Sequence, residues 1–245
     1  MVLFREACRP AYRAIVGLTG TIASGKSHAR DVLRDLGACT VDADAVAHEA
    51  YRRGTPCFDA VVAAFGAAVV GVDGEIDRRR LGGIVFADAA ALQRLNELVW
   101  PAVRQLVVEK LDAQAAERAQ QQHRDDRDDA PPPRRQRRPL VGVVEAALLF
   151  ESGWAAQVDE VWLTYVPDVV AVRRLHERNG LDEGEARRRL ALQQRSVSTA
   201  DKLAAARVAV DTSGAKAVTR GLIEREWAAL MERLSRGDVV AQSDH

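Results

Sequence analysis

The sequence contains few cysteines, and they do not form a recognisable framework. Cys8, Cys39 and Cys57 are the three cysteines among 245 residues, and no C-x-x-C pair occurs. We therefore expect neither a disulfide-stapled scaffold nor a zinc ribbon. A reducing, cytoplasmic location fits this composition, and Cys39 and Cys57 are interpreted as small apolar core residues.

Long hydrophobic runs are also missing. The longest apolar stretch covers residues 60–70, short of the ~18 residues that a membrane span needs. It contains Gly66, and we interpret it as a buried helix. Residues 1–13 are interpreted as an N-terminal extension without a signal peptide, because four residues interrupt any apolar region there: Arg5, Glu6, Arg9 and Pro10. No membrane partner is expected.

A surplus of charge is absent as well. The 35 basic and 35 acidic residues cancel, whereas a protein that coats nucleic acid needs excess cation, so we expect no nucleic-acid partner. Only four of the basic residues are Lys, which leaves 31 Arg. We attribute this preference for Arg to the base composition of the genome more than to function. Hydrophobic residues at 47% and charged residues at 29% are typical of one ample globular domain or two small ones.

Short apolar runs alternate with helical spacing, which is the pattern of an α/β protein. Five runs are predicted as buried parallel strands, at residues 14–19, 38–41, 140–144, 160–166 and 208–210. Helices are predicted at 26–36, 169–178, 185–195 and 215–234, the first closed by Gly37. The expected fold is a P-loop type, doubly wound, five-stranded parallel sheet.

The segment between strands two and three differs from the rest. Helical spacing recurs at 45–53, 57–65, 88–100 and 102–116, which predicts a helical insertion where a small-molecule kinase holds its acceptor. Residues 118–139 are rich in Gln, Asp, Arg and Pro, so we expect a disordered surface insertion. Its basic end, 134–138, leaves open a contact with RNA or anionic lipid.

The sharpest motif is G-x-x-x-x-G-K-S, which runs without a gap from Gly20 to Ser27. Its glycines let successive backbone N–H groups point at phosphate oxygens, and the following helix adds the positive end of its dipole. Lys26 would reach the β- and γ-phosphates, and the Ser27 hydroxyl is a hard ligand for Mg²⁺. A strand before the motif and a helix after it complete the context for binding a nucleoside triphosphate.

Other motifs narrow the class of P-loop protein. The N-K-x-D signature of a GTPase is missing, and Asp211-Thr212-Ser213-Gly214 lies too late in the chain to act as a switch. A small-molecule kinase needs a carboxylate near the acceptor hydroxyl. Asp42 and Asp44 end the second strand, and we assign chemistry to Asp42 and helix capping to Asp44.

Arg174 and Arg178 are the candidates for a lid. They lie four residues apart, on one face of a predicted helix, and lead into Asn179-Gly180. Guanidinium groups on a mobile segment can neutralise the charge of a transferring phosphoryl group and exclude water. The alternative is ordinary surface arginine on an Arg-rich chain.

These residues together resemble the dephospho-CoA kinase family, from about residue 15 to 222. The stretch Val16–Ser27 is similar to the family's V-G-L-T-G-G-I-G-S-G-K-S, and residues 41–44 resemble its D-A-D element. Four later stretches also match in order: D-R-x-x-L near 77–81 with I-V-F at 84–86, L-L-F-E at 148–151, Arg174-x-x-x-Arg178 with Arg189-x-x-x-Gln193, and Lys202-x-x-x-Ala206.

The resemblance implies transfer of the ATP γ-phosphate to the ribose 3′-hydroxyl of dephospho-CoA, with Mg²⁺ as cofactor. It implies a kinase-like domain over 14–222, with an acceptor region at about 45–117 and a lid at about 173–195, followed by the end of a helix and a polar tail at 223–245. Lys26, Asp42, Arg174 and Arg178 would be catalytic. The nucleotide would be held by the cradle residues Gly20, Ala23, Ser24, Gly25, Lys26, Ser27 and His28, and the metal by Ser27.

Several positions depart from the family pattern: Thr21, His28, Trp100, Glu145, Ala147 and Arg207. Two alternatives to the implied activity follow, namely another P-loop nucleoside or nucleotide kinase, and a nucleotide-binding relative with weakened catalysis. The expected small-molecule partners are ATP and dephospho-CoA, and the expected assembly is a monomer or weak homo-oligomer.

Overall fold

A computed structural model describes residues 4–9, 11–128, 139–193 and 196–237, with the backbone alone described at 122–128. The chain divides into two compact units. The first, which we call the sheet unit, comprises Met1–Val41 and Leu111–His245. The second, the helical unit, comprises Asp42–Lys110.

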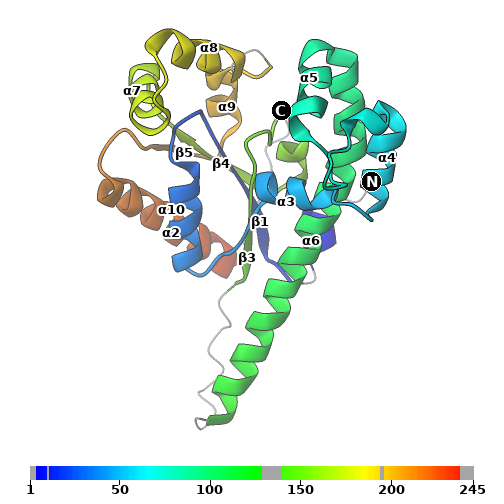
Figure 1. The fold of residues 1–245 in the computed structure, drawn as a ribbon. Coiled ribbons are helices and arrows are strands. Elements are labelled where there is room, and N and C mark those ends of the chain that lie inside the picture. The colour runs from blue at the N-terminus through cyan, green and yellow to red at the C-terminus, as the bar shows by residue number, and fades with distance from the viewer. Residues whose placement is uncertain (1–3, 10, 129–138, 194–195, 238–245) are drawn as a thin grey trace. The chain divides into compact units, whose positions relative to one another are not determined.

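A five-stranded sheet forms the centre of the sheet unit, as the sequence predicted (Figure 1). The strands are β1 (Ala14–Gly20), β2 (Cys39–Asp42), β3 (Val141–Glu145), β4 (Glu160–Tyr165) and β5 (Val208–Asp211), in the order β2-β3-β1-β4-β5. β1 pairs in parallel with β3 and with β4, and β4 pairs in parallel with β5. Every residue of β1 and β3 is buried, which explains their continuous apolar sequence.

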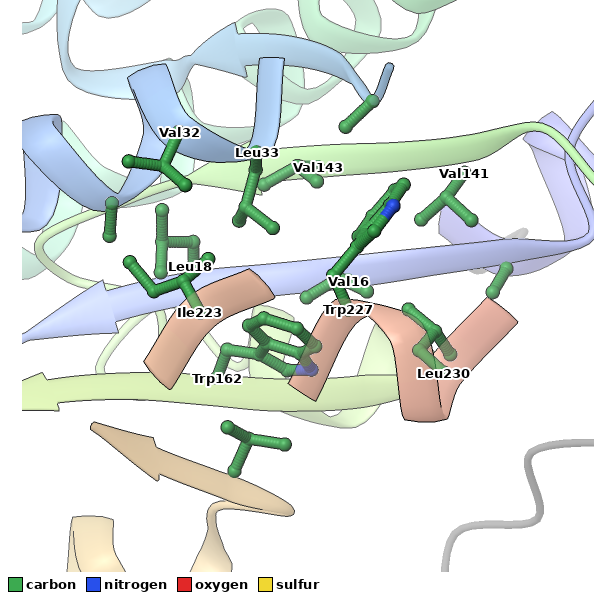
Figure 2. Packing of buried hydrophobic residues seen from close by; sticks show 14 of the residues in the cluster. Val16, Leu18, Val32, Leu33, Val141, Val143, Trp162, Ile223, Trp227 and Leu230 are labelled. Atoms are coloured by element: carbon green, nitrogen blue, oxygen red, sulfur yellow. The ribbon is translucent and has the colours of Figure 1, made fainter. Parts of the chain in front are cut away.

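One hydrophobic core lies between the sheet and two helices, α2 (Lys26–Asp35) and α10 (Lys216–Arg236). Figure 2 shows Val32 and Leu33 of α2 and Ile223 and Trp227 of α10 pointing at Val16 and other strand residues. Along α10 the buried positions recur every three or four residues, at Ile223, Trp227, Leu230 and Leu234, so one face of the helix meets the sheet. Each fully buried large side chain stabilises the fold by about 1.5–3 kcal/mol.

Further helices of the sheet unit are α1 (Phe4–Cys8), the 3₁₀ turn η2 (Trp154–Gln157), α7 (Asp168–Asn179), α8 (Glu183–Gln193) and α9 (Thr199–Ala205). Residues 4–8, which were predicted to belong to an N-terminal extension, pack against the rest of the sheet unit. Phe4 is buried and contacts Trp154 edge to face, with ring centroids 4.9 Å apart. Figure 1 shows α7, α8 and α9 beyond the carboxyl ends of β4 and β5.

The helical unit contains α3 (Ala43–Ala50), α4 (Pro56–Phe65), the 3₁₀ turn η1 (Ala67–Val69), α5 (Arg78–Ala87) and the first part of α6 (Ala89–Asp128). The prediction of a buried helix over 60–70 was wrong beyond Phe65. Gly66 adopts a φ of +85°, which ends α4, and Ala67 and Ala68 are exposed. A left-handed φ of this kind favours glycine and stops a right-handed helix.

Two predictions about α6 were also wrong. The sequence predicted separate helices at 88–100 and 102–116 and disorder from 118, but one helix runs through Pro101 to Asp128. Proline removes one backbone donor, which strong helix formers on either side can outweigh. Residues 117–128 are polar yet helical, because Ala, Glu, Gln and Arg favour helix without burial. The rest of the predicted insertion, including the basic residues 134–138, lies outside the described residues.

The three cysteines are buried thiols outside any disulfide, in keeping with apolar packing roles. Of the four tryptophans, Trp154, Trp162 and Trp227 are buried and Trp100 is half-buried. Within the described parts of the chain, no helix has both the length and the apolar character required to cross a bilayer.

Candidate functional site

The glycine-rich loop lies between β1 and α2, as its sequence context predicted. β1 ends at Gly20 and α2 begins at Lys26, with Gly25 preceding the helix at a φ of +73°. A side chain at position 20 would collide with the hydroxyls of Thr164 and Ser24, so that position requires glycine. The backbone N–H groups that begin α2 have no earlier helical carbonyl to bond, and with the helix dipole they favour an anion.

Hydrogen bonds from α8 and β4 hold the loop in place. The Ile22 N–H donates to Gln193 Oε1 at 2.7 Å, and Gln193 Nε2 donates to the Gly20 carbonyl at 3.3 Å. On the other side, the Thr21 N–H donates to the Thr164 carbonyl at 3.0 Å. These bonds tie the loop to two elements distant in sequence, which fixes its conformation before any ligand binds.

A second set of contacts holds the far end of the loop. The Thr212 hydroxyl donates to the Ser24 carbonyl at 2.6 Å, and Arg174 Nη1 donates to the Ala23 carbonyl at 3.0 Å. Arg174 Nη2 donates to the Thr212 carbonyl. Ala23 has a φ of +57° and is the one non-glycine with positive φ among the described residues. A side chain in this left-handed region is strained, so Ala23 carries backbone strain that these contacts hold in place.

A cavity of about 610 Å³ opens beside the loop. It brings together five of the predicted site residues with five others, and its lining is Ala23, Gly25, His28, Arg174, Glu177, Arg178, Thr212, Gly214, Lys216 and Thr219. Its volume lies within the range of small-molecule sites. Arg178 is exposed, donates to the Asn179 side chain, and leads to Gly180, which ends α7 at a φ of +66°.

Sequence reasoning missed the contribution of residues 212–219 to this cavity. The D-x-x-G stretch at 211–214 was set aside as a switch motif, yet Thr212 and Gly214 line the cavity and His28 Nε2 lies 3.4 Å from the Lys216 carbonyl. A signal was available, because these residues follow the predicted strand at 208–210. Ligands of open α/β sheets bind beyond the carboxyl ends of the strands.

A buried carboxylate lies next to the cradle, and its role was also missed. Glu145 ends β3 with a side chain only 2% exposed. Its Oε1 lies 3.3 Å from Lys26 Nζ and accepts a 3.3 Å hydrogen bond from the Ser27 hydroxyl. Its Oε2 lies 2.8 Å from Arg30 Nη1. From the sequence, Glu145 was noted only as a departure from the family pattern, although its place at the end of a predicted strand pointed to the site.

The capping assignment of the two aspartates was wrong. Asp42, not Asp44, caps α3: its Oδ1 accepts a 3.0 Å bond from the Ala45 N–H, and its backbone is extended at φ −87° and ψ 101°. The reason is that β2 continues to Asp42 and α3 begins at Ala43, so Asp42 occupies the N-cap position. Asp44 lies in the first helical turn, where a negative charge is favoured by the helix dipole.

Two further motif residues meet in the sheet unit. Lys202 of α9 has a side chain only 2% exposed, and its Nζ lies 3.2 Å from Glu151 Oε1, which follows β3. The last residue of the L-L-F-E stretch and the first residue of the K-x-x-x-A stretch thus form one largely buried ion pair. In the helical unit, Asp77 caps α5 by accepting from the N–H groups of Arg79 and Arg80, and these bonds lower the pKa of its carboxyl below the ordinary value.

Comparison with known proteins agrees with this arrangement. The family model described as dephospho-CoA kinase matches residues 14–121 and 134–217. The dephospho-CoA kinase of Geobacter sulfurreducens is 41% identical over 87% of this chain and 97% of its own. That of Symbiobacterium thermophilum is 40% identical over 88% of this chain and 80% of its own.

Among solved structures, a crystal structure of a protein from Thermus thermophilus superposes with a TM-score of 0.66 and 30% identity. It covers 90% of this chain and 97% of its own. The family match spans the cradle, the helical unit and the helices around the cavity. The chain therefore belongs to the dephospho-CoA kinase family.

Proposed function

We propose that this protein transfers the γ-phosphate of ATP to the ribose 3′-hydroxyl of dephospho-CoA, giving coenzyme A and ADP. The observation that carries the proposal is the family match through both the cradle and the motifs downstream of it. The braced loop from Gly20 to Ser27 supports it, because phosphoryl transfer depends on positioning and charge neutralisation more than on covalent help.

The nucleotide is assigned to the cradle and the cavity. Gly20, Ala23, Ser24, Gly25 and the first turn of α2 would surround the phosphates, with unbonded backbone N–H groups pointing at them and the Lys26 ammonium at the β- and γ-phosphates. The 610 Å³ cavity beside them, which includes His28, is large enough for a nucleoside.

Mg²⁺ is assigned to Ser27, and the residues present fit it. The Ser27 hydroxyl and the Glu145 carboxylate are hard oxygen donors 3.3 Å apart, the class of ligand that Mg²⁺ takes. Mg²⁺, when bound, would neutralise charge on the β- and γ-phosphates. Glu145 would orient the Ser27 hydroxyl by accepting its proton in a hydrogen bond, which leaves the oxygen lone pairs for the metal.

The acceptor hydroxyl is assigned to Asp42, and the transferring group to Arg174 and Arg178. Asp42 would accept or aim the proton of the 3′-hydroxyl as its oxygen attacks the γ-phosphorus and the bond to the β,γ-bridging oxygen breaks. The guanidinium groups would stabilise the charge on the equatorial oxygens. Arg174 is already oriented by Ala23 and Thr212, so it would contribute as a fixed group.

The first test is ADP release by purified protein with ATP and Mg²⁺, with dephospho-CoA, AMP or adenosine as acceptor. We expect turnover that requires dephospho-CoA and that falls at least about a hundredfold in Lys26→Ala and in Asp42→Asn. Asp44→Asn is the matched control for Asp42→Asn and should retain activity. Preference for AMP or adenosine would identify another nucleotide kinase, and ATP binding without turnover would identify a non-catalytic relative.

We further propose that the protein acts in the cytoplasm as a monomer or weak homo-oligomer, without nucleic-acid or membrane partners. The neutral net charge supports the absence of a nucleic-acid partner. Light scattering across a concentration series, and binding assays with RNA and with anionic vesicles, test these points directly.

A further inference from the structure

The Glu145 carboxylate has two cationic neighbours, and a bound nucleotide would affect their ion pairs with Glu145 differently. Lys26 and Arg30 lie four residues apart on α2, so both side chains lie on one face of the helix and reach the end of β3. Lys26 is the last residue before the cradle's hydroxyl ligand. Arg30 is one helical turn further along α2, away from the loop.

Binding a triphosphate changes the charge balance around this carboxylate. Lys26 lies 3.3 Å from Glu145, and contact with the β- and γ-phosphates competes with that ion pair. If Lys26 were the sole counterion, its departure would leave a carboxylate that is 98% buried without a compensating charge, which is strongly unfavourable. The Arg30 pair at 2.8 Å, on the other carboxylate oxygen, can remain in place throughout.

We propose that Arg30 is a positioning residue that releases Lys26 for the nucleotide. By staying paired with Glu145 it keeps the buried carboxylate neutralised while Lys26 moves, and it holds Oε1 next to the Ser27 hydroxyl. Arg30 acts through Glu145 and does not itself contact the phosphates. The proposal rests on the proposed nucleotide site, but it does not depend on which acceptor the enzyme uses.

The test is the dissociation constant for ATP, measured by calorimetry in EDTA so that no metal contributes. Arg30→Met removes the second counterion and should weaken ATP binding about tenfold or more, because the buried carboxylate loses the charge that stays with it when Lys26 moves. Arg34→Met is the matched control: Arg34 lies on the same helix and pairs with Asp31, and its affinity should stay within about twofold of wild type, as expected of an exposed pair. Arg30→Lys keeps the charge and should restore most of the binding.

A double-mutant cycle separates this role from general destabilisation. In the Glu145→Gln background no buried charge needs compensation, so Arg30→Met should then change ATP affinity by less than about threefold. Affinities are compared below each variant's melting transition, followed by circular dichroism. Arg30→Gln, which removes the charge but keeps a polar side chain, carries the same expectation as Arg30→Met and replaces it if that variant does not fold.

Two results would overturn the proposal. One is ATP binding by the neutral Arg30 variant within about twofold of wild type, since a lost counterion must cost more than an exposed pair. The other is a tenfold loss that persists in the Glu145→Gln background. Wild-type protein that binds ATP but makes no coenzyme A would count against the proposed reaction. The double-mutant cycle could still be measured on such a protein, because it uses ATP affinity alone.

Discussion

Gln193 should be necessary for a preformed cradle. Its side-chain amide accepts a hydrogen bond from the Ile22 N–H at 2.7 Å and donates one to the Gly20 carbonyl at 3.3 Å. One side chain at the end of α8 therefore holds two residues of the loop. Gln193→Ala removes two hydrogen bonds. At about 1 kcal/mol net each, the loss is about 2 kcal/mol, or about thirtyfold in nucleotide affinity if the whole effect falls on ordering the loop.

The assay is a titration of wild type and Gln193→Ala with ATP, together with the KM for ATP in the coupled reaction. We expect the dissociation constant and KM to rise in parallel, because the loop must be ordered at the cost of binding energy. Gln105→Ala serves as the control, since Gln105 is an exposed helix residue that bonds Glu109. ATP affinity within twofold of wild type, in a folded Gln193→Ala protein, would refute the reasoning.

Three other predictions concern stability, each measured by urea unfolding. Ala23→Gly should raise the free energy of unfolding by up to about 1 kcal/mol, because glycine adopts the +57° φ of this position without strain; a decrease would contradict the strain assignment. Lys202→Met should lower the free energy of unfolding by about 3 kcal/mol, because it leaves the largely buried Glu151 carboxylate unpaired. Adding Glu151→Gln should recover much of that loss. Equal stability of the single and double variants would contradict this explanation. Because the pKa of Asp77 is lowered in the folded protein, its carboxylate stabilises the fold at pH values above the ordinary pKa of 3.8, and this effect is lost as the pH falls through the folded pKa. Wild type should therefore be more stable than Asp77→Asn at pH 7, and the two should converge in acid. A stability difference that is constant with pH would exclude a charge effect.

Local patterns in the sequence were enough to predict the centre of the fold. β1, the loop from Thr21 to Gly25 and α2 follow one another within about twenty residues, so their order and hydrophobic spacing predict them directly. The five strands were found for the same reason, because buried parallel strands are short apolar runs bounded by turns. Arg174 and Arg178 were chosen as one helical face, and both do line the cavity.

Errors arose where a local rule competed with a neighbouring element. Proline usually ends a helix, but α6 continues through Pro101 because the flanking residues favour helix strongly. Asp42 and Asp44 are equally good capping residues by type, and the one-residue difference in where β2 ends decided between them. Such boundaries cannot be predicted to single residues from a sequence pattern.

The contacts that brace the cradle could not be predicted, because they join residues far apart in the chain. Gln193, Thr212 and Glu145 reach the loop from three different elements, and only the folded sheet brings them together. Their positions at strand and helix ends near one edge of the sheet indicate a site in general terms. Which side chain bonds which loop atom depends on rotamers that no pattern in one sequence contains.

The measurement that tests the account most directly is identification of the reaction product. Purified protein, ATP, Mg²⁺ and dephospho-CoA are incubated, and the acceptor fraction is examined by mass spectrometry and phosphorus NMR beside the Lys26→Ala protein. The account predicts a product that co-elutes with coenzyme A, carries one new monoester phosphate at the ribose 3′ position, forms in equal amount with ADP, and is absent from the variant. ADP formed without a phosphorylated acceptor, or phosphate at another position, would contradict it.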